Sequence, residues 1–499
     1  GELSMRSIAI RLFLTCWLVY GFHFATNIVR EVYPALSLGD SLSFDVSGYV
    51  GLHPDIFELP DGRAYINNNP GASILAAAPY AAARPVIDAV VERVNERRQA
   101  SNDEPVTYDT QWPNRQRFFR AAYERGLDVK FGLAAGVMQF FLMAPLTALS
   151  AVVMFFLLNR LTGSVRASVW LSVLYAFATP VFYRTGFLNH NLLLGHLGFF
   201  AFLMIWRPWS ADGPLRPLYL FVAGVLVGWT VVLDYSGLVV VLCVSGYVLA
   251  KWLSQPPTER RISSLAFYAA GVALSGFMLM LYQWSAFGHP IWPAQHYMPA
   301  TDYSDEGLDG MGLPTLDLLW QTAFSIRYGL FTSAPILLLA LYPPSWLEGR
   351  FRLLERRETW FVLLFTVALF LFCAANRYSY VQFNTGVRYA VPLVPFLFLI
   401  VSGVLLKMPR WAAVAVSAVG LYWSWCLSMI RDVELGLGIF DTVRDVTLGG
   451  PRLPWLTTLE RMGYVSNSAI VWVVLAAMFA AVGLLWTLRV GRPSLQTAS

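Results

Sequence analysis

Charged residues are unevenly spaced along the chain, and long apolar stretches lie between them. A charge at the centre of a bilayer is costly and a spanning helix needs about 20 mostly apolar residues, so each long charge-free stretch predicts a transmembrane helix. This pattern predicts an all-α polytopic membrane protein with about 12 transmembrane helices. The twelve charge-free stretches are 12–29, 131–159, 167–183, 185–206, 217–233, 235–250, 262–301, 328–347, 359–376, 389–406, 411–430 and 462–488.

The stretches divide the chain into membrane segments and three longer connections. The stretch at 262–301 holds one span that ends near Trp284, and a Gly/Pro/His-rich loop follows it. Within the first connection, Gly71 to Arg98 is predicted to form a helix on the membrane surface, because it starts apolar and ends charged. The predicted segments are transmembrane helix 1 in 5–29, an extracytoplasmic loop with juxtamembrane helices in 30–130, helices 2–7 in 131–285, a loop in 286–327, helices 8–11 in 328–431, a loop in 432–461, and helix 12 with a cytoplasmic tail in 462–499.

The orientation follows from the positive charges of the short connections. Cytoplasmic loops carry an excess of Lys and Arg, and here that excess falls on the side of the amino terminus, for example at Arg356 and Arg357. An even number of spans then places both termini in the cytoplasm. The three longer connections face the outside.

Composition supports the membrane assignment and excludes other classes. Apolar residues make up 57% of the chain and charged residues 13%, against roughly 45–50% and 25% in soluble domains. The net charge of +5 is small and dispersed, so it gives no indication of nucleic-acid binding. The four cysteines lie in separate apolar stretches, without the spacing of a disulfide framework or a zinc site.

The first candidate for chemistry is Asp40, about a dozen residues beyond the first span. A carboxylate just outside the bilayer, beside the flexible Gly39, is suited to taking a proton from a hydroxyl. Capping of a surface helix is an equally good explanation of this residue. Asp45 and Asp55 are its rivals, and spacing alone does not choose among the three.

Two further polar segments are candidates for binding. Between the turn signals Asp61-Gly62 and Pro70-Gly71, Tyr65 and a triple Asn that ends at Asn69 offer groups for a phosphate or for sugar hydroxyls. The alternative is two turns that bracket a polar strand. In the predicted outside turn between helices 3 and 4, Arg184 and His190 together favour an anion.

Two more candidates lie at the predicted outer ends of helices. Asp234, followed by Tyr235, is the only charge between two apolar stretches, so it requires a partner on the same face. Arg388, followed by Tyr389, has the planar fork that binds phosphate in a bidentate manner, although a snorkelling helix-end Arg is the alternative. All these candidates lie on one side of the predicted topology, which indicates an outward-facing cavity.

The order of these features resembles the integral-membrane glycosyltransferases of the GT-C superfamily, which include protein O-mannosyltransferases and the aminoarabinose transferases of lipid A. The resemblance covers nearly the whole chain, although each motif alone is weak. The stretches that carry it are Gly39-Asp40-Ser41, the Asp-Gly-Arg-x-Tyr turn at Asp61 to Tyr65 with Pro70-Gly71, Phe287 to Pro290, Arg327 to Phe331, the Asn189-His190 turn, and Gly386-Val387-Arg388-Tyr389 with Pro392, Pro395 and Phe396.

The resemblance implies a protein of the bacterial cytoplasmic membrane whose active site faces outward. Its donor would be a sugar linked to a polyprenyl phosphate, and its acceptor a hydroxyl of a lipid, a glycan or a protein. It implies that Asp40 acts as base, that the configuration of the sugar inverts, and that Arg388, Arg184, His190 and Asn69 stabilise the departing phosphate.

Two other functions and one cofactor remain open at this point. A transporter or flippase for polyprenyl-linked glycans would show two similar halves and ionisable residues near the bilayer midplane, and neither is visible. A ligase that moves a whole glycan from a diphosphate carrier would use the same kind of cavity. The loop from Asp302 to Gly310 offers clustered oxygens that suit a hard divalent cation.

Overall fold

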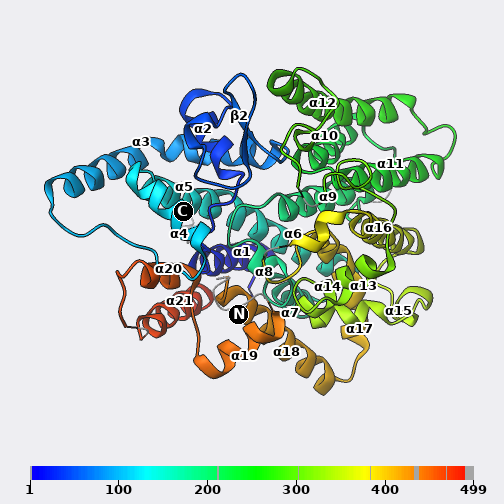
Figure 1. The fold of residues 1–499 in the computed structure, drawn as a ribbon. Coiled ribbons are helices and arrows are strands. Elements are labelled where there is room, and N and C mark those ends of the chain that lie inside the picture. Colours follow the sequence, from blue (N-terminus) through cyan, green and yellow to red (C-terminus); the bar gives the residue numbers. More distant parts are fainter. Residues whose placement is uncertain are drawn as a thin grey trace, which may run out of the picture.

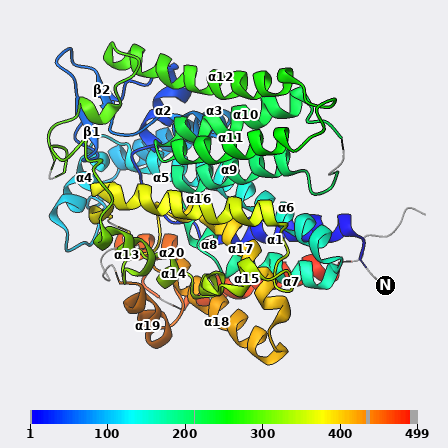
Figure 2. The same ribbon diagram turned by 90° about the vertical axis from the view of Figure 1, so that its right-hand side faces the viewer.

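The computed structural model describes residues 3–210, 213–301, 303–382, 384–431, 438–467 and 469–488. The described chain is mostly helical, and its long helices form one bundle (Figures 1 and 2). Seven helices of the described part are long and apolar enough to cross a membrane, so this is a multi-pass membrane protein. They are α1 (Met5–Phe22), α3 (Gly71–Ala100), the continuous α5 (Asp128–Met138), η2 (Gln139–Met143) and α6 (Ala144–Thr162), α12 (Ile262–Phe287), α16 (Arg356–Ala375), α18 (Arg410–Met429) and α21 (Ile470–Thr487).

Shorter elements complete the fold. Five more apolar helices lie in the bundle: α7 (Val165–Phe177), α9 (His190–Trp206), α10 (Pro217–Leu233), α11 (Gly237–Leu253) and α17 (Val394–Lys407). The remaining elements are α2 (Val32–Ser41), η1 (Ser47–Tyr49), β1 (Ile56–Glu58), β2 (Ala64–Ile66), α4 (Pro113–Glu124), α8 (Val181–Arg184), η3 (Ala294–His296), α13 (Leu316–Phe324), α14 (Leu330–Ser333), η4 (Pro335–Leu341), α15 (Pro344–Leu347), η5 (Arg377–Val381), η6 (Val391–Leu393), α19 (Ile439–Gly449) and α20 (Pro454–Arg461).

Most predicted spans correspond to apolar helices, but the stretch at 328–347 does not. The structure divides it into α14, η4 and α15 instead of one continuous helix. Pro335 begins η4, and Pro343 and Pro344 flank the start of α15. Proline has no N–H to donate and its ring clashes with the preceding turn, so these residues interrupt the ladder of helical hydrogen bonds.

The first connection contains the long helix that the sequence predicts there, but the helix is less clearly confined to the membrane surface than predicted. Helix α3 extends over 30 residues and projects away from the bundle at its charged end (Figure 1). By length and composition it also belongs to the seven helices that could cross a membrane. Before α3, β1 and β2 pair as an antiparallel hairpin around the Asp61-Gly62 turn. This arrangement agrees with the alternative interpretation of the segment, in which two turns bracket a polar strand.

Close helix packing in the bundle depends on small residues, as is typical of membrane helices. Helices α10 and α12 have the most extensive contact of any pair of described elements. A Cβ atom on Gly224 of α10 would lie 2.2 Å from the carbonyl oxygen of Tyr268, and one on Gly271 of α12 would lie 2.2 Å from that of Phe221. Glycine at both positions therefore lets the two backbones touch.

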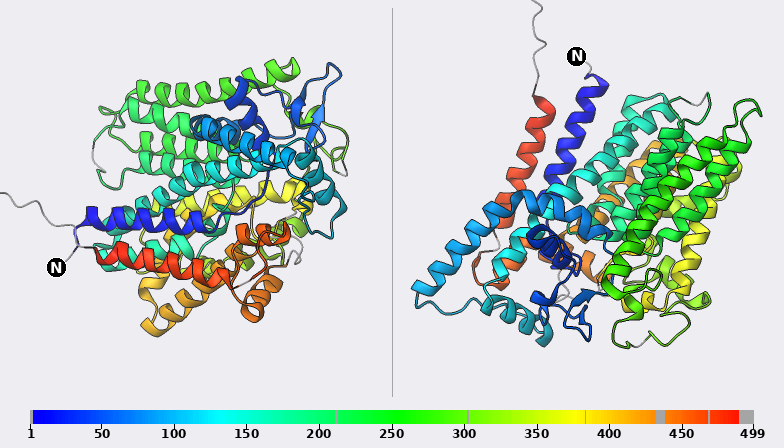
Figure 3. Two further views of the ribbon diagram at one scale, coloured as in Figure 1. Left: turned by 90° about the vertical axis from the view of Figure 1, so that its left-hand side faces the viewer. Right: turned by 90° about the horizontal axis from the view of Figure 1, so that it is seen from above.

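The described ends of the chain lie together at one end of the bundle. Helices α1 and α21 run side by side (Figure 3), and Arg11 of α1 donates to the carbonyl oxygens of Leu485 and Leu488. The opposite end of the bundle carries β1, β2, α4, α13 and α20 (Figure 2). We call this opposite end the site end.

Candidate functional site

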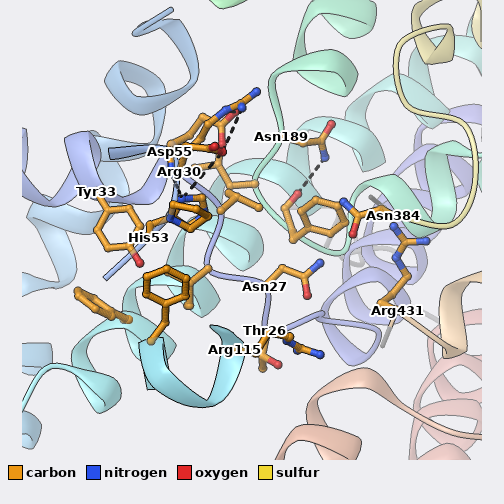
Figure 4. Close-up of a pocket in the computed structure, with 18 of the residues that line it drawn as sticks. Thr26, Asn27, Arg30, Tyr33, His53, Asp55, Arg115, Asn189, Asn384 and Arg431 are labelled. Carbon is orange, nitrogen blue, oxygen red and sulfur yellow. Dashed lines mark hydrogen bonds and ion pairs between the residues drawn. The ribbon is translucent and has the colours of Figure 1, made fainter. Parts of the chain in front are cut away.

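A cavity of about 1300 Å³ lies at the site end, where several segments meet that are far apart in the sequence. Its wall combines the α1–α2 connection, α4, the start of α5, the turn before α9, the end of α10 and the segment before α17. Figure 4 shows Arg30, His53 and Asp55 on one side of the cavity and Arg431 on another. The cavity is therefore assembled from connections between helices, while the bundle supplies the scaffold.

One wall carries three arginines, Arg184, Arg388 and Arg431, which we call the arginine wall. The side chains of Arg184 and Arg431 are 1% and 8% exposed. Within the described part of the chain, Nε and Nη1 of Arg184 and Nε and Nη2 of Arg431 have no hydrogen-bond partner. Buried donors without partners are rare in native proteins, because each carries the full cost of desolvation.

The electrostatics of the arginine wall agree with this geometry. Burial, and then the charges of Arg431 and Arg388, lower the pKa of Arg184 to about 9. Burial also lowers the pKa of Arg431 to about 10. The guanidinium group of Arg431 stacks over the rings of Tyr183 and Phe187, with 5.0 and 5.6 Å to the ring centroids. Among the described residues neither Arg184 nor Arg431 forms an ion pair with a carboxylate, and Glu31 is the one carboxylate whose charge partly offsets the lowering of the Arg184 pKa. Buried cations of this kind suit the binding of an anion.

The local sequence explains how Arg184 and Arg388 are held. Asn189 caps α9 by accepting from the N–H of Leu192, and its Nδ2 donates to the carbonyl oxygens of Arg184 and Phe187 at 2.5 and 3.0 Å. Two residues before Arg388, Gly386 has φ +92° and lies where a Cβ atom would be 2.6 Å from the Tyr183 hydroxyl oxygen. Only glycine tolerates both the backbone conformation and this contact.

A second wall carries Glu31, His190 and Asp234, which we call the acidic wall. His190 Nδ1 lies 2.8 Å from Glu31 Oε1, which also accepts from Asn68 Nδ2 at 2.7 Å. His190 Nε2 lies 3.7 Å from Asp234 Oδ1. Burial would raise the pKa of Glu31, but the hydrogen bond with His190 and the charge of Arg30 hold it well below its usual value. Glu31 is therefore an anion.

Arg30 forms an ion pair with Asp55 on the cavity wall, and its Nε also lies 3.8 Å from Glu31 Oε1. Arg30 Nη1 donates to Asp55 Oδ2 at 3.2 Å and to Asn67 Oδ1 at 3.1 Å. His53 Nδ1 lies 3.9 Å from the same Asp55 oxygen. This pair neutralises Asp55, so Asp55 is less available as a base than an unpaired carboxylate would be.

The lining of the cavity also includes the apolar side chains of Phe24, Leu133, Trp455 and Met462. Leu133 belongs to the span formed by α5 and α6, and it is 36% exposed. Part of the cavity lining therefore belongs to a helix that is long and apolar enough to cross a membrane.

The structure brings together some of the residues predicted from sequence and separates others. Arg184, His190, Asp234, Arg388 and Tyr389 all line the cavity, as does the rival carboxylate Asp55. Four predicted site residues are not among its lining: Asp40, Tyr65, Asn69 and Tyr235.

The four residues outside the lining have other contacts. Asp40 accepts from the Tyr80 hydroxyl at 2.7 Å and pairs with Lys130 Nζ at 2.8 Å. Asn69 Nδ2 donates to the carbonyl oxygen of Val231 at 2.8 Å, which fixes the loop to α10. The hydroxyls of Tyr65 and Tyr235 accept from Arg63 and Gln283. Asp45 Oδ1 accepts from the backbone N–H groups of Ser47 and Ala64. The geometry thus gives no support to Asp40 as the base.

Sequence reasoning missed Arg30, Glu31 and Arg431, which all line the cavity. Each had a signal: Arg30 and Glu31 directly follow the apolar stretch 12–29, and Arg431 directly follows 411–430. His190 was expected near a phosphate, whereas the structure places it between two carboxylates.

No cluster of three or more His, Cys, Asp or Glu side chains that could hold a metal ion occurs among the described residues. Asp302, the first residue of the acidic loop considered for a divalent cation, lies outside them. In the comparisons with known proteins, no protein-family model, curated protein or solved structure matched the chain.

Proposed function

We propose that this protein is an inverting, GT-C-like glycosyltransferase. It moves a single sugar from a polyprenyl-phosphate carrier to a hydroxyl acceptor on the outer side of a bacterial cytoplasmic membrane. The observation that carries the proposal is the arginine wall, because its buried guanidinium groups have N–H groups with no partner among the described residues, and a phosphate matches their fork geometry.

The shape of the cavity supports a lipid-linked donor. The polyprenyl chain lies in the bilayer and enters past the apolar side chain of Leu133, while the phosphate meets the arginine wall. The departing phosphate gains negative charge as the bond to the sugar breaks. Fixed cations that are already desolvated stabilise this charge without reorganisation, which is the largest contribution in many enzymes.

The polar residues on the other walls suit the sugar and the acceptor. Asn67 and Asn68 present amide groups, and Tyr378 and Tyr389 present aromatic rings, all within the cavity lining. Amides match sugar hydroxyls, and aromatic rings match the apolar faces of a sugar. The acceptor remains a lipid, a glycan or a protein hydroxyl.

A transfer assay with matched variants tests the proposal. Membranes that contain the protein are incubated with a panel of labelled polyprenyl-phosphate sugars, and the labelled product is identified. We expect transfer by the wild type and its loss in Arg431→Gln, while Arg120→Gln, an exposed arginine of α4 paired with Glu124, keeps full activity.

Two outcomes would contradict the proposal. If the wild type neither binds polyprenyl phosphate nor transfers sugar, the donor class is wrong. If proteoliposomes translocate a polyprenyl-linked glycan without transferring sugar, the protein is a flippase.

A further inference from the structure

We propose that His190 accepts the proton of the acceptor hydroxyl, with Glu31 fixing the orientation of its ring and Asp234 stabilising the imidazolium that forms. This inference rests on the proposed function and names the group that activates the acceptor. It assigns the proton transfer to the acidic wall of the cavity and not to the first-loop residue Asp40.

The contacts of His190 fix the orientation of its imidazole ring. His190 is 2% exposed and begins α9 directly after the cap residue Asn189, so its backbone position is fixed. Glu31 Oε1 lies 2.8 Å from Nδ1, which is hydrogen-bond distance, and Glu31 is an anion that can only accept. Asn68 Nδ2 also lies 3.1 Å from Nδ1, but it donates to the same Glu31 oxygen at 2.7 Å, so the anion favours a proton on Nδ1 and leaves the lone pair of the neutral ring on Nε2.

The other ring nitrogen of His190, Nε2, faces Asp234. Its distance of 3.7 Å from Asp234 Oδ1 is too long for a direct hydrogen bond. Asp234 is held by Ser236, whose backbone N–H and hydroxyl donate to Oδ2 at 3.1 and 2.6 Å. These two bonds leave Oδ1 directed toward the imidazole, so an acceptor hydroxyl can lie beside both atoms.

Glu31 Oε1 also lies 3.8 Å from Arg30 Nε, whereas the ion pair given for Asp234 among the described residues is with His190. The other carboxylates near the cavity pair with arginine or lysine. Asp55 is paired with Arg30, and Asp128 forms two hydrogen bonds with Arg98 at 2.9 and 3.0 Å. Asp40 pairs with Lys130 and is not part of the cavity lining. The acidic wall is where a histidine and two carboxylates meet inside the cavity.

Proton transfer to His190 accompanies the transfer of the sugar. The hydroxyl proton moves to His190 Nε2 as the hydroxyl oxygen bonds to the anomeric carbon of the donor sugar. The bond between that carbon and the phosphate oxygen breaks, and its electron pair stays on the phosphate, which the arginine wall stabilises. The imidazolium is then flanked by Glu31 and Asp234 until it returns its proton to water.

The test separates proton transfer from donor binding. We expect His190→Ala to lower the turnover of sugar transfer by about 10²–10⁴-fold, the usual contribution of general acid–base catalysis. Its affinity for polyprenyl phosphate should stay within about twofold of wild type, because the phosphate contacts lie on the arginine wall. Added imidazole should restore part of the turnover, since it replaces the missing base. His296→Gln, on an exposed histidine that is not part of the cavity lining, is the matched control and should transfer normally.

Glu31→Gln and His190→Gln complete the series. Glu31→Gln keeps a polar partner for Nδ1 but no longer fixes the tautomer, so we expect reduced turnover with donor affinity retained. His190→Gln, which keeps hydrogen-bonding capacity, should behave like His190→Ala in turnover but gain nothing from imidazole if glutamine fills the site.

The results that would overturn the role of His190 differ from those that would refute the proposed transferase function. Turnover of His190→Ala within a few-fold of wild type would overturn the role of His190. A large loss that imidazole does not restore, together with an equal loss in Asp234→Asn, would move the base to Asp234 and also overturn it. A wild-type protein that binds polyprenyl phosphate but transfers no sugar would refute the transferase itself, and this role with it.

Discussion

Replacing Arg184 by methionine should make the empty protein more stable and prevent it from binding its anion. Methionine is unbranched and shorter, and it has no charge and no donors. The pKa of Arg184 lies at about 9 instead of 12.5 because the charged group is buried and faces other cations. At about 1.4 kcal/mol per pH unit, the difference corresponds to roughly 5 kcal/mol against the charged form. We expect Arg184→Met to recover about 1–4 kcal/mol of this, the range found when buried charges are replaced by apolar residues of similar volume.

Thermal unfolding in lipid nanodiscs, with and without polyprenyl phosphate, measures both effects. The wild type should gain stability from the ligand, because anything that binds only the folded state stabilises it. Arg184→Met should unfold at a higher temperature than the empty wild type and show no shift with ligand. Arg120→Met, which changes a largely exposed arginine, should match the wild type in both measurements.

The lowered pKa of Arg184 also sets the direction in which the stability of the protein changes with pH. The folded pKa of Arg184 is depressed, so above about pH 9 the unfolded chain binds a proton that the folded chain has released. The stability of the wild type relative to Arg184→Met should therefore rise as pH increases through 9. A variant that is less stable than wild type at pH 7, and still responds to polyprenyl phosphate, would refute the interpretation of Arg184 as an uncompensated anion ligand.

Three further predictions concern other residues. Asp40→Asn should keep turnover within a few-fold of wild type in the transfer assay, because Asp40 contacts Tyr80 and Lys130 and not the cavity; a loss of 10²-fold or more would restore it as the base. Arg388→Lys keeps the charge but loses the planar fork, so the affinity for polyprenyl phosphate, measured by titration, should fall about tenfold while the unfolding temperature is unchanged. Single cysteines at Asn67 and Asp305 should react with a membrane-impermeant thiol reagent from outside the cell, whereas one at Arg356 should not; the reverse pattern would place the cavity on the cytoplasmic side.

Charge spacing located most of the apolar helices because a bilayer penalises charge regardless of tertiary structure. However, only six of the twelve predicted stretches coincide with described helices that are long and apolar enough to cross a membrane. The stretch at 328–347 failed for a local reason, since its prolines interrupt the helix without adding a charge. The spacing of charges alone does not reveal that a proline lacks the backbone N–H group a helix needs. The same method gave no distinction between a helix that lies on the surface and one that could cross, as the length and composition of α3 show.

The candidate site was predictable where a charge sits at the very end of an apolar stretch. Arg184, Asp234 and Arg388 have such positions, and all three line the cavity. Asp40 is not part of the cavity lining, and its place in the sequence could not show this because position along the chain does not give direction in space. It lies nine residues beyond Glu31 on α2, about 13 Å along the helix at 1.5 Å per residue, and this distance carries it out of the cavity lining. The pairing of Glu31 with His190 joins residues 159 positions apart, which sequence spacing cannot reveal.

The π-helical turn η2, between α5 and α6, separates two parts of one long helix. Gln139 at its start is 1% exposed and donates to the carbonyl oxygens of Tyr20 and Thr185, at 3.0 and 3.1 Å. A π-turn accommodates one residue more than a regular helix, and each residue of an α-helix rotates the chain by about 100°. Because the wider turn absorbs the extra residue, α5 and α6 keep nearly the phase that one continuous α-helix would give them. Deleting one residue from η2 would therefore remove the bulge and displace Gln139 from Tyr20 and Thr185, while Leu133 of α5 would keep nearly its direction relative to α6.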